Sequence, residues 1–248
     1  FGKINLGLRH ISDKYSLENF QINEFIDTNQ KINSKTTFIT GEYLKTFSKV
    51  ELNAKTENYV FGDNKSSIFS SSVIVKLKNN NNLTANYKLL SSAPNYNFLL
   101  HRSNYENYNW NNQFDNSITN SISLGLELRE IIDLNVDLIS VRKHIQFEKI
   151  INDLADSSEY SILPVQHNGN LDILKFRLAR KINFGKFSID SKLLFQKSLS
   201  DDIINIPQIV SRNTFYFSTD MFKKALFLQT GFGVKIFSKF YMNGYDPL

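Results

Sequence analysis

The sequence of 248 residues contains no cysteine. This absence excludes disulfide bonds, zinc sites built on thiolates and cysteine nucleophiles. The chain also lacks any run of lysine and arginine, because its net charge of +5 comes from basic residues that are spread singly along it. A nucleic-acid-binding surface usually gathers such residues in a patch or stripe. The sequence therefore predicts no nucleic-acid partner.

Long hydrophobic runs are absent as well. No apolar stretch approaches the roughly 18 to 20 residues that a transmembrane helix needs. The longest candidate, ALFLQTGFGVKIF from Ala225, is interrupted by Gln229, Thr230 and Lys235. No signal peptide is visible, yet the chain begins at Phe1 without a methionine and stops abruptly at YDPL. We therefore expect a fragment, and the missing signal does not indicate a cytoplasmic protein.

Sequence motifs of catalysis and metal binding are also missing. There is no GxSxG elbow and no P-loop, and the pair Gly231 and Gly233 lacks the third glycine and the following helix of a nucleotide-binding loop. The histidines are dispersed and show no HExxH spacing: His10, His101, His144 and His167. We expect no catalytic residues, no metal and no cofactor. His144 and His167 bracket one long connection and could meet in space, but a solvated pair is the favoured interpretation.

Alternating polarity is what the sequence does contain. In SISLGLELREIIDLNVDLISV, residues 121–141, Ile122 and Leu124 alternate with Ser123 and Gly125, and the alternation resumes beyond Glu130. Successive side chains of a strand point to opposite faces, so this period of two predicts two antiparallel strands joined by a tight turn. One face of the pair is apolar and the other is charged.

The same pattern predicts five hairpins along the chain. Their short turns lie near Ser48, at 79–81, at Glu130, at 183–185 and near Met221. The connections between hairpins are longer and more polar, and one further strand at 1–12 gives about eleven strands. Strands of about ten residues, with short turns at one end and long loops at the other, are typical of transmembrane β-barrels.

A soluble β-sandwich is the structural alternative, because alternation does not tell inside from outside. Sandwich strands average nearer five or six residues, which favours the barrel. Aromatic residues at the strand ends favour it too, since they suit the two aromatic girdles of a barrel. They are Phe47, Phe184 and Phe222 near short turns, and Tyr59, Phe61, Tyr105, Tyr108 and Trp110 near long loops. We predict an all-β, antiparallel, up-and-down barrel occupying residues 1–248 as one domain.

The two faces of the predicted sheet have different chemistry. The outward, apolar set includes Ile39, Val50, Leu52, Val73, Val75, Leu83, Tyr87, Leu124, Leu126, Leu134, Val136, Phe176, Leu178, Ile189, Leu193, Phe215, Phe217, Phe232 and Val234. The predicted channel-lining set is Glu42, Glu51, Lys55, Lys76, Lys88, Glu127, Arg129, Asp133, Asp137, Lys175, Arg177, Asp190, Lys192, Arg212 and Lys235. Burying so many charged side chains in a dry interior would cost roughly several kcal/mol for each charge. A water-filled lumen is therefore expected. The apolar residues Ile74, Leu90, Ile139 and Leu194 interrupt the charged face.

One segment departs from period two. In HIQFEKIINDLAD, residues 144–156, Phe147, Ile150, Ile151 and Leu154 follow helical spacing. The spacing predicts a short helix within a long loop, packed on the rim of the barrel in preference to folding inward as a constriction.

Three longer runs carry a family resemblance: SSAPNYNFLLHRSNYENYNW (91–110), LPVQHNGNLDILKF (163–176) and NIPQIVSRNTFYFSTDMFKKALFLQTGFGVKIFSKFYMNGYDP (205–247). They resemble the "Putative porin" family of Bacteroidota outer membranes. The resemblance covers most of the chain from about residue 36 and implies an outer-membrane β-barrel that passes small solutes passively. Because members of that family are longer, it also implies an internal fragment.

The functional hypothesis is a porin-like channel of the bacterial cell outer membrane without enzymatic activity. Its expected partners are outer-membrane lipid and small hydrophilic solutes, and homo-oligomers are left open. Selectivity would come from charge and width. Two alternatives are kept: a non-conducting barrel that acts as scaffold or receptor through its long loops, and, less favoured, an outer-membrane hydrolase.

Overall fold

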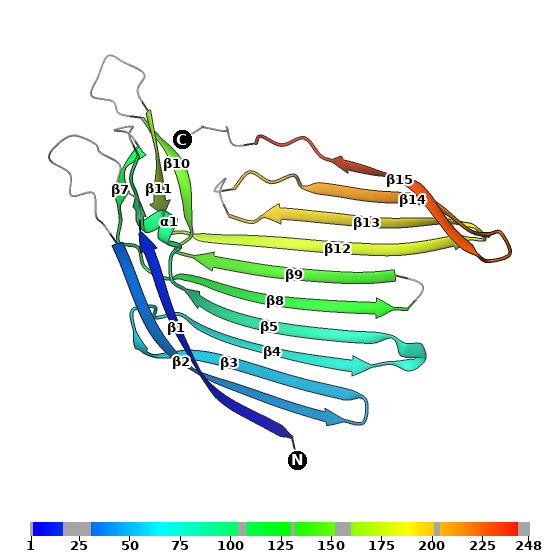
Figure 1. The fold of residues 1–248 in the computed structure, drawn as a ribbon, viewed down its shortest axis with the longest axis horizontal. Helices are drawn as coiled ribbons and strands as arrows, with labels where there is room; N and C mark the ends of the chain where they lie inside the picture. Colours follow the sequence, from blue (N-terminus) through cyan, green and yellow to red (C-terminus); the bar gives the residue numbers. More distant parts are fainter. Residues whose placement is uncertain are drawn as a thin grey trace.

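A single antiparallel sheet dominates the computed structural model, which describes residues 2–16, 31–103, 108–129, 132–151, 160–200 and 204–242. Eleven strands follow one another in chain order across it. They are β1 (Lys3–Ser16), β2 (Lys31–Phe47), β3 (Val50–Gly62), β4 (Ser67–Lys76), β5 (Asn82–Ser92), β8 (Ser117–Leu128), β9 (Ile132–Arg142), β12 (Asn170–Phe184), β13 (Phe187–Ser198), β14 (Ile209–Met221) and β15 (Leu226–Phe237). β1 and β15 form the two edges, so the sheet is open (Figure 1). The predicted fold class is confirmed as an all-β, up-and-down sheet.

The short turns that the structure describes lie at one end of the sheet, and the strand ends that lead into the long connections lie at the other (Figure 1). The turn predicted at Glu130 falls outside the described residues. The turn between β2 and β3 needs only Ser48 and Lys49, and Ser48 has a φ of 45°. Gly185, between β12 and β13, has a φ of 61°, a conformation that glycine adopts without strain. The asymmetry predicted from the sequence is therefore confirmed for the hairpins of the main sheet.

Two small sheets lie at the long-connection end. Helix α1 (Tyr96–Leu99) precedes the pair β6 (Leu100–His101) and β7 (Trp110–Asn111), and β10 (Ile145–Ile151) pairs with β11 (Tyr160–Gln166). Together these elements are called the rim assembly. At the opposite end, the one-turn helix η1 (Lys78–Asn80) forms part of the turn between β4 and β5.

The prediction of a helix within 144–156 is wrong. Phe147, Ile150 and Ile151 lie in strand β10, whereas Leu154 lies outside the described residues. The physical reason is that a stripe of four residues supplies little helix stability in isolation. Pairing with β11, where Phe147 lies opposite Pro164, satisfies the backbone of this segment instead.

The strands are staggered in a constant direction. One cross-strand row passes through Lys76, the last residue of β4 before its short turn, and reaches Arg212, which lies at the opposite end of β14. With about 3.3 Å per residue and about 4.8 Å between strands, this stagger corresponds to a strand tilt of about 45°. That tilt is typical of closed β-barrels.

The cross-strand register separates the side chains into two faces. Directly paired residues share a face: Leu124 pairs with Val136, which pairs with Phe176, whereas Ser123 pairs with Asp137, which pairs with Lys175. All the residues of the predicted outward set share the first face, here called the apolar face. Its large side chains are exposed, including Ile122, Leu124 and Phe187.

Buried side chains are few, and most of the apolar ones belong to the rim assembly. Among the described residues the buried apolar side chains are Phe38, Leu100, Trp110, Ile145, Leu171 and Pro164. The accessible surface is 17834 Å², whereas a compact soluble monomer of 28.7 kDa would have about 11,000 Å². Within the described ranges, no helix is long and apolar enough to span a membrane. The sheet therefore leaves its apolar face uncovered, which a folded sandwich would not do.

The aromatic residues at the strand ends do not all lie where the two predicted girdles would place them. Phe47, Phe184 and Phe222 are exposed at the short-turn end. At the other end Trp110 is buried inside the rim assembly, and Tyr59 pairs with Phe38 on the face opposite the apolar one. These two residues do not belong to an outer girdle, because tertiary packing draws Trp110 inward and the register turns Tyr59 away. Tyr105 lies outside the described residues.

Two glycines of β15 provide a matched test of strand packing. A Cβ added at Gly231 would lie 2.1 Å from the carbonyl oxygen of Phe215, whereas one at Gly233 would meet its nearest atom at 3.8 Å. We expect Gly231→Ala to push β15 away from β14 and to lower the hydrogen-exchange protection of β15 amides. Gly233→Ala should leave that protection unchanged, and equal protection in both variants would contradict the described pairing.

Candidate functional site

The face opposite the apolar one is called the polar face. The register places every residue of the predicted channel-lining set on it, including Arg129, which follows the last residue of β8. The four interrupting residues Ile74, Leu90, Ile139 and Leu194 also lie there. The same alternation, followed further along β3 and β12 and on β1, would have added Glu57, Lys181 and Arg9, which share this face. That these residues line a channel stays a prediction.

The polar face is the concave side of the sheet. A hollow of about 580 Å³ lies on it, across β5, β8, β9, β12, β13 and β14, and a second of about 410 Å³ lies over β1 to β4. Gly125 and Ala179 lie in the larger hollow, which Glu127, Asp133, Arg177, Lys192 and Arg212 also line. Small residues at these two positions leave the space open. Sequence reasoning missed both, since neither carries a charge.

Ion pairs neutralise part of the polar face. Arg177 donates to Asp137 at 2.7 Å and to Asn135 at 2.7 Å, and Ser123 donates to Asp137 at 2.6 Å. Asp137 is only 6% exposed, so these contacts replace the water that its carboxylate loses. Lys55 lies 2.9 Å from Glu42. Further pairs join Arg9 to Glu57 and Lys76 to Glu51.

One cross-strand row in the hollow carries unbalanced charge. Glu127 lies directly opposite Asp133, and Asp133 lies opposite Ala179. Beyond Ala179 the row continues through Lys192, Arg212 and Lys235 on successive strands. Two carboxylates and three cations therefore stand side by side within a single row, separated by one alanine.

The rim assembly reaches across the concave side at the long-connection end. Tyr15 of β1 donates to the carbonyl oxygen of Leu100 at 3.3 Å, and its ring lies 5.6 Å from that of Tyr96. In the sheet, β2, β3 and β4 separate β1 from β5, the strand that precedes α1. The contact between Tyr15 of β1 and the segment that follows β5 therefore spans the concave side of the curved sheet directly. The rim assembly narrows this end of the concave space.

Aromatic rings form the centre of the rim assembly. Trp110 stacks on His101 with ring centroids 4.6 Å apart and donates from Nε1 to the carbonyl oxygen of Asn97 at 3.0 Å. Phe147 of β10 lies 5.6 Å from Trp110 and 5.3 Å from Phe98. These contacts join α1, β6–β7 and β10–β11 into one packed unit.

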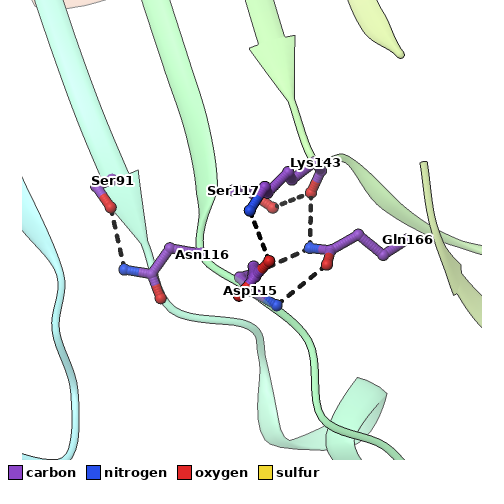
Figure 2. A network of polar contacts seen from close by, with 6 residues as sticks. All are labelled: Ser91, Asp115, Asn116, Ser117, Lys143 and Gln166. Atoms are coloured by element: carbon purple, nitrogen blue, oxygen red, sulfur yellow. Dashed lines mark hydrogen bonds and ion pairs between the residues drawn. The ribbon is translucent and has the colours of Figure 1, made fainter. Parts of the chain in front are cut away.

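A polar network attaches β10–β11 to the main sheet (Figure 2). The Gln166 side chain donates to the carbonyl oxygens of Asp115 and Lys143 at 2.8 and 3.1 Å, and accepts from the Asp115 amide at 3.1 Å. Ser117 donates to the Lys143 carbonyl oxygen at 2.7 Å, and Lys143 Nζ lies 2.6 Å from the Asp115 carboxylate. The ends of β8, β9 and β11 are thereby held together.

His144 and His167 meet at the base of the β10–β11 hairpin, with ring centroids 6.4 Å apart. His167 Nε2 lies 2.7 Å from the Glu148 carboxylate. Burial lowers the pKa of His144, the neighbouring His167 lowers it further, and a hydrogen bond with Gln146 opposes the shift. Burial and the charge of Arg102 likewise lower the pKa of His101. The solvated pair favoured from sequence is in fact a partly buried one.

Comparison with protein families gives a match over the whole chain. Residues 1–248 match the family described as "Putative porin". The chain belongs to this porin family. The resemblance read from the sequence is thereby confirmed at the level of the family. No curated protein matches the chain.

Among solved structures, the porin-family chain resembles the siderophore receptor PirA from Acinetobacter baumannii. The two share 10% identity with a TM-score of 0.58, over 87% of this chain and 37% of the receptor. At this identity the likeness shows the fold alone, that of part of an outer-membrane barrel. The chain spans 37% of the receptor's length.

Asp137 and Asp133 provide a matched pair for testing the polar face, since they share β9 and differ in surroundings. Replacing Asp137 with alanine should lower the free energy of unfolding by about 1 to 2 kcal/mol, because two hydrogen bonds to a nearly buried carboxylate are lost. Exposed Arg177 can regain water, which keeps the cost moderate. Asp133→Ala should cost nothing, and equal losses in urea denaturation of the vesicle-bound protein would contradict this account.

The lowered pKa of His144 predicts a pH-dependent rim assembly. The unfolded hairpin takes up a proton near the ordinary histidine pKa of about 6.5, whereas the folded one takes it up only at lower pH. The stability that neutral His144 gives to the folded hairpin is therefore present above the ordinary histidine pKa and is lost as the pH falls below it. We expect exchange protection of β10 and β11 amides to fall between about pH 7.5 and about pH 5.5. His144→Gln should weaken this dependence, and His10→Gln on β1 should preserve it.

Proposed function

We propose that the complete protein is an outer-membrane channel through which small hydrophilic solutes diffuse passively, without an enzymatic step. The observation that carries this proposal is the division of most apolar and most charged side chains between the two faces by the register. One face of an eleven-stranded sheet is apolar and exposed, and the other is charged and concave. Lipid suits the first face and water suits the second.

Energetics supports a water-filled concave side. The polar face presents carboxylates, ammonium groups and guanidinium groups, many of them exposed. Removing an unpaired charged group from water costs roughly several kcal/mol, even after relaxation. A lumen that contains water leaves the charged side chains hydrated, and their charge and spacing then decide which solutes pass.

The open sheet supports a larger barrel. Strand edges left unpaired in a bilayer would expose backbone N–H and C=O groups to hydrocarbon, which membrane proteins avoid by closing the barrel. β1 and β15 each present one such edge in this chain. We propose that further strands of the complete protein close the barrel, and the family suggests a Bacteroidota outer membrane as its place.

A receptor function is the second candidate. The rim assembly narrows one end of the concave side through the Tyr15 contact, and the similar solved structure is that of a siderophore receptor. A packed rim of this kind offers a surface for capturing a ligand at the mouth of a barrel. Deletion of 144–167 should abolish ligand capture and leave permeability unchanged if the receptor function is correct.

Conductance in planar bilayers tests the channel directly. The complete protein is first shown to fractionate with membranes and to change its gel mobility on heating. In the bilayer it should then add discrete conductance steps that persist at low voltage. A passive, water-filled lumen requires no ligand for this conductance. A folded protein that gives no steps at any voltage would contradict the channel and favour the receptor.

A further inference from the structure

We propose that Lys192, Arg212 and Lys235 form an anion site in the lumen, which holds solutes carrying a carboxylate or a phosphate group as they pass. The proposal rests on the channel function proposed above and names the solutes that it favours. The three residues are called the cation ladder.

The register is the first argument for the site. Lys192 pairs directly with Arg212, and Arg212 pairs directly with Lys235, so three cations lie opposite one another on β13, β14 and β15. Directly opposed residues have Cβ atoms about 5 Å apart, and like charges at such positions destabilise a sheet. The fold itself therefore gains nothing from this arrangement.

Lack of neutralisation is the second argument. No ion pair or hydrogen bond of these three side chains occurs among the residues that the structure describes. Elsewhere on the polar face, Arg177 is paired with Asp137 and Lys55 with Glu42. All three ladder residues are exposed, so their charges are available to a solute.

The hollow is the third argument. Lys192 and Arg212 line the space of about 580 Å³ that small residues keep open, and Ala179 lies next to Lys192 in the same row. This volume lies in the range of pockets that take small molecules. A guanidinium group beside ammonium groups is a set of donors suited to carboxylate and phosphate oxygens.

The acid pair on the far side of Ala179 gives the row a negative end, and the cation ladder forms its positive end. Asp133 lies two strands from Lys192, about 10 Å across the sheet, and Glu127 lies one strand further away. They repel an anion on one side while the cation ladder attracts it on the other. A solute with both an anionic and a cationic group would align along the row, whereas a simple cation would be repelled by the ladder.

Ion selectivity of the complete protein in planar bilayers tests this inference. In a potassium chloride gradient, the ratio of chloride to potassium permeability should exceed one. The double variant Lys192→Gln Arg212→Gln should lower the ratio about fivefold or more, the factor for one unit charge at contact distance in water. Inorganic phosphate added to one side should reduce the chloride current of the parent protein and should reduce that of the variant less.

Two further variants make the test specific. Lys78→Gln removes an exposed cation from the short turn between β4 and β5, outside the channel-lining set, and should leave the ratio and the phosphate effect unchanged. Glu127→Gln Asp133→Asn removes the acid pair and should raise the ratio. Because the ladder opposes folding, its glutamine variants should keep or raise the thermal midpoint of unfolding.

The outcomes separate the two proposals. A conducting protein whose ratio changes as much in Lys78→Gln as in the ladder variant would overturn the anion site and leave the channel intact, since net charge alone would then set selectivity. A conducting parent with a ratio below one would overturn the site in the same way. Absence of conductance would overturn the channel and the site together.

Discussion

Cross-strand register is the constraint on which every other feature of this sheet depends. A shift of β9 by one residue against both of its neighbours would exchange its two faces and set Asp137 opposite Leu124 and Phe176. The observed register keeps apolar residues opposite apolar ones on strand after strand. Most of the large apolar side chains therefore lie on one face of the sheet and most of the charged ones on the other.

Local pairing and unpaired charge have different roles on the concave face. The contacts among Asp137, Arg177 and Ser123 satisfy a carboxylate that is nearly buried, and so contribute to stability. The row through Asp133, Lys192 and Arg212 has like charges side by side and contributes nothing to it. Natural proteins retain such unfavourable groups where function requires them. The division fits a channel whose frame is held by some ions and whose selectivity is set by others.

The rim assembly shows where sequence patterns lose their predictive power. Phe147, Ile150 and Ile151 follow helical spacing, yet long-range pairing with 160–166 makes the segment a strand. Trp110 lies in a loop in the sequence and is buried, with ring contacts to His101 of β6 and Phe147 of β10. Neither result follows from local propensity, because the partners are distant along the chain. The same holds for the meeting of His144 with His167 and for the lowered pKa of His144.

The sequence by itself determined the eleven strands of the main sheet and the membership of its two faces, because a period of two is a local property of each segment. It also contained the charges of Asp133 and Asp137, but gave no reason to distinguish them. Only the tertiary structure decided that Asp137 is paired and nearly buried, that Asp133 stands exposed in the hollow, and that three cations from separate strands share one row. Those outcomes depend on the relative shift of strands, which no single segment encodes.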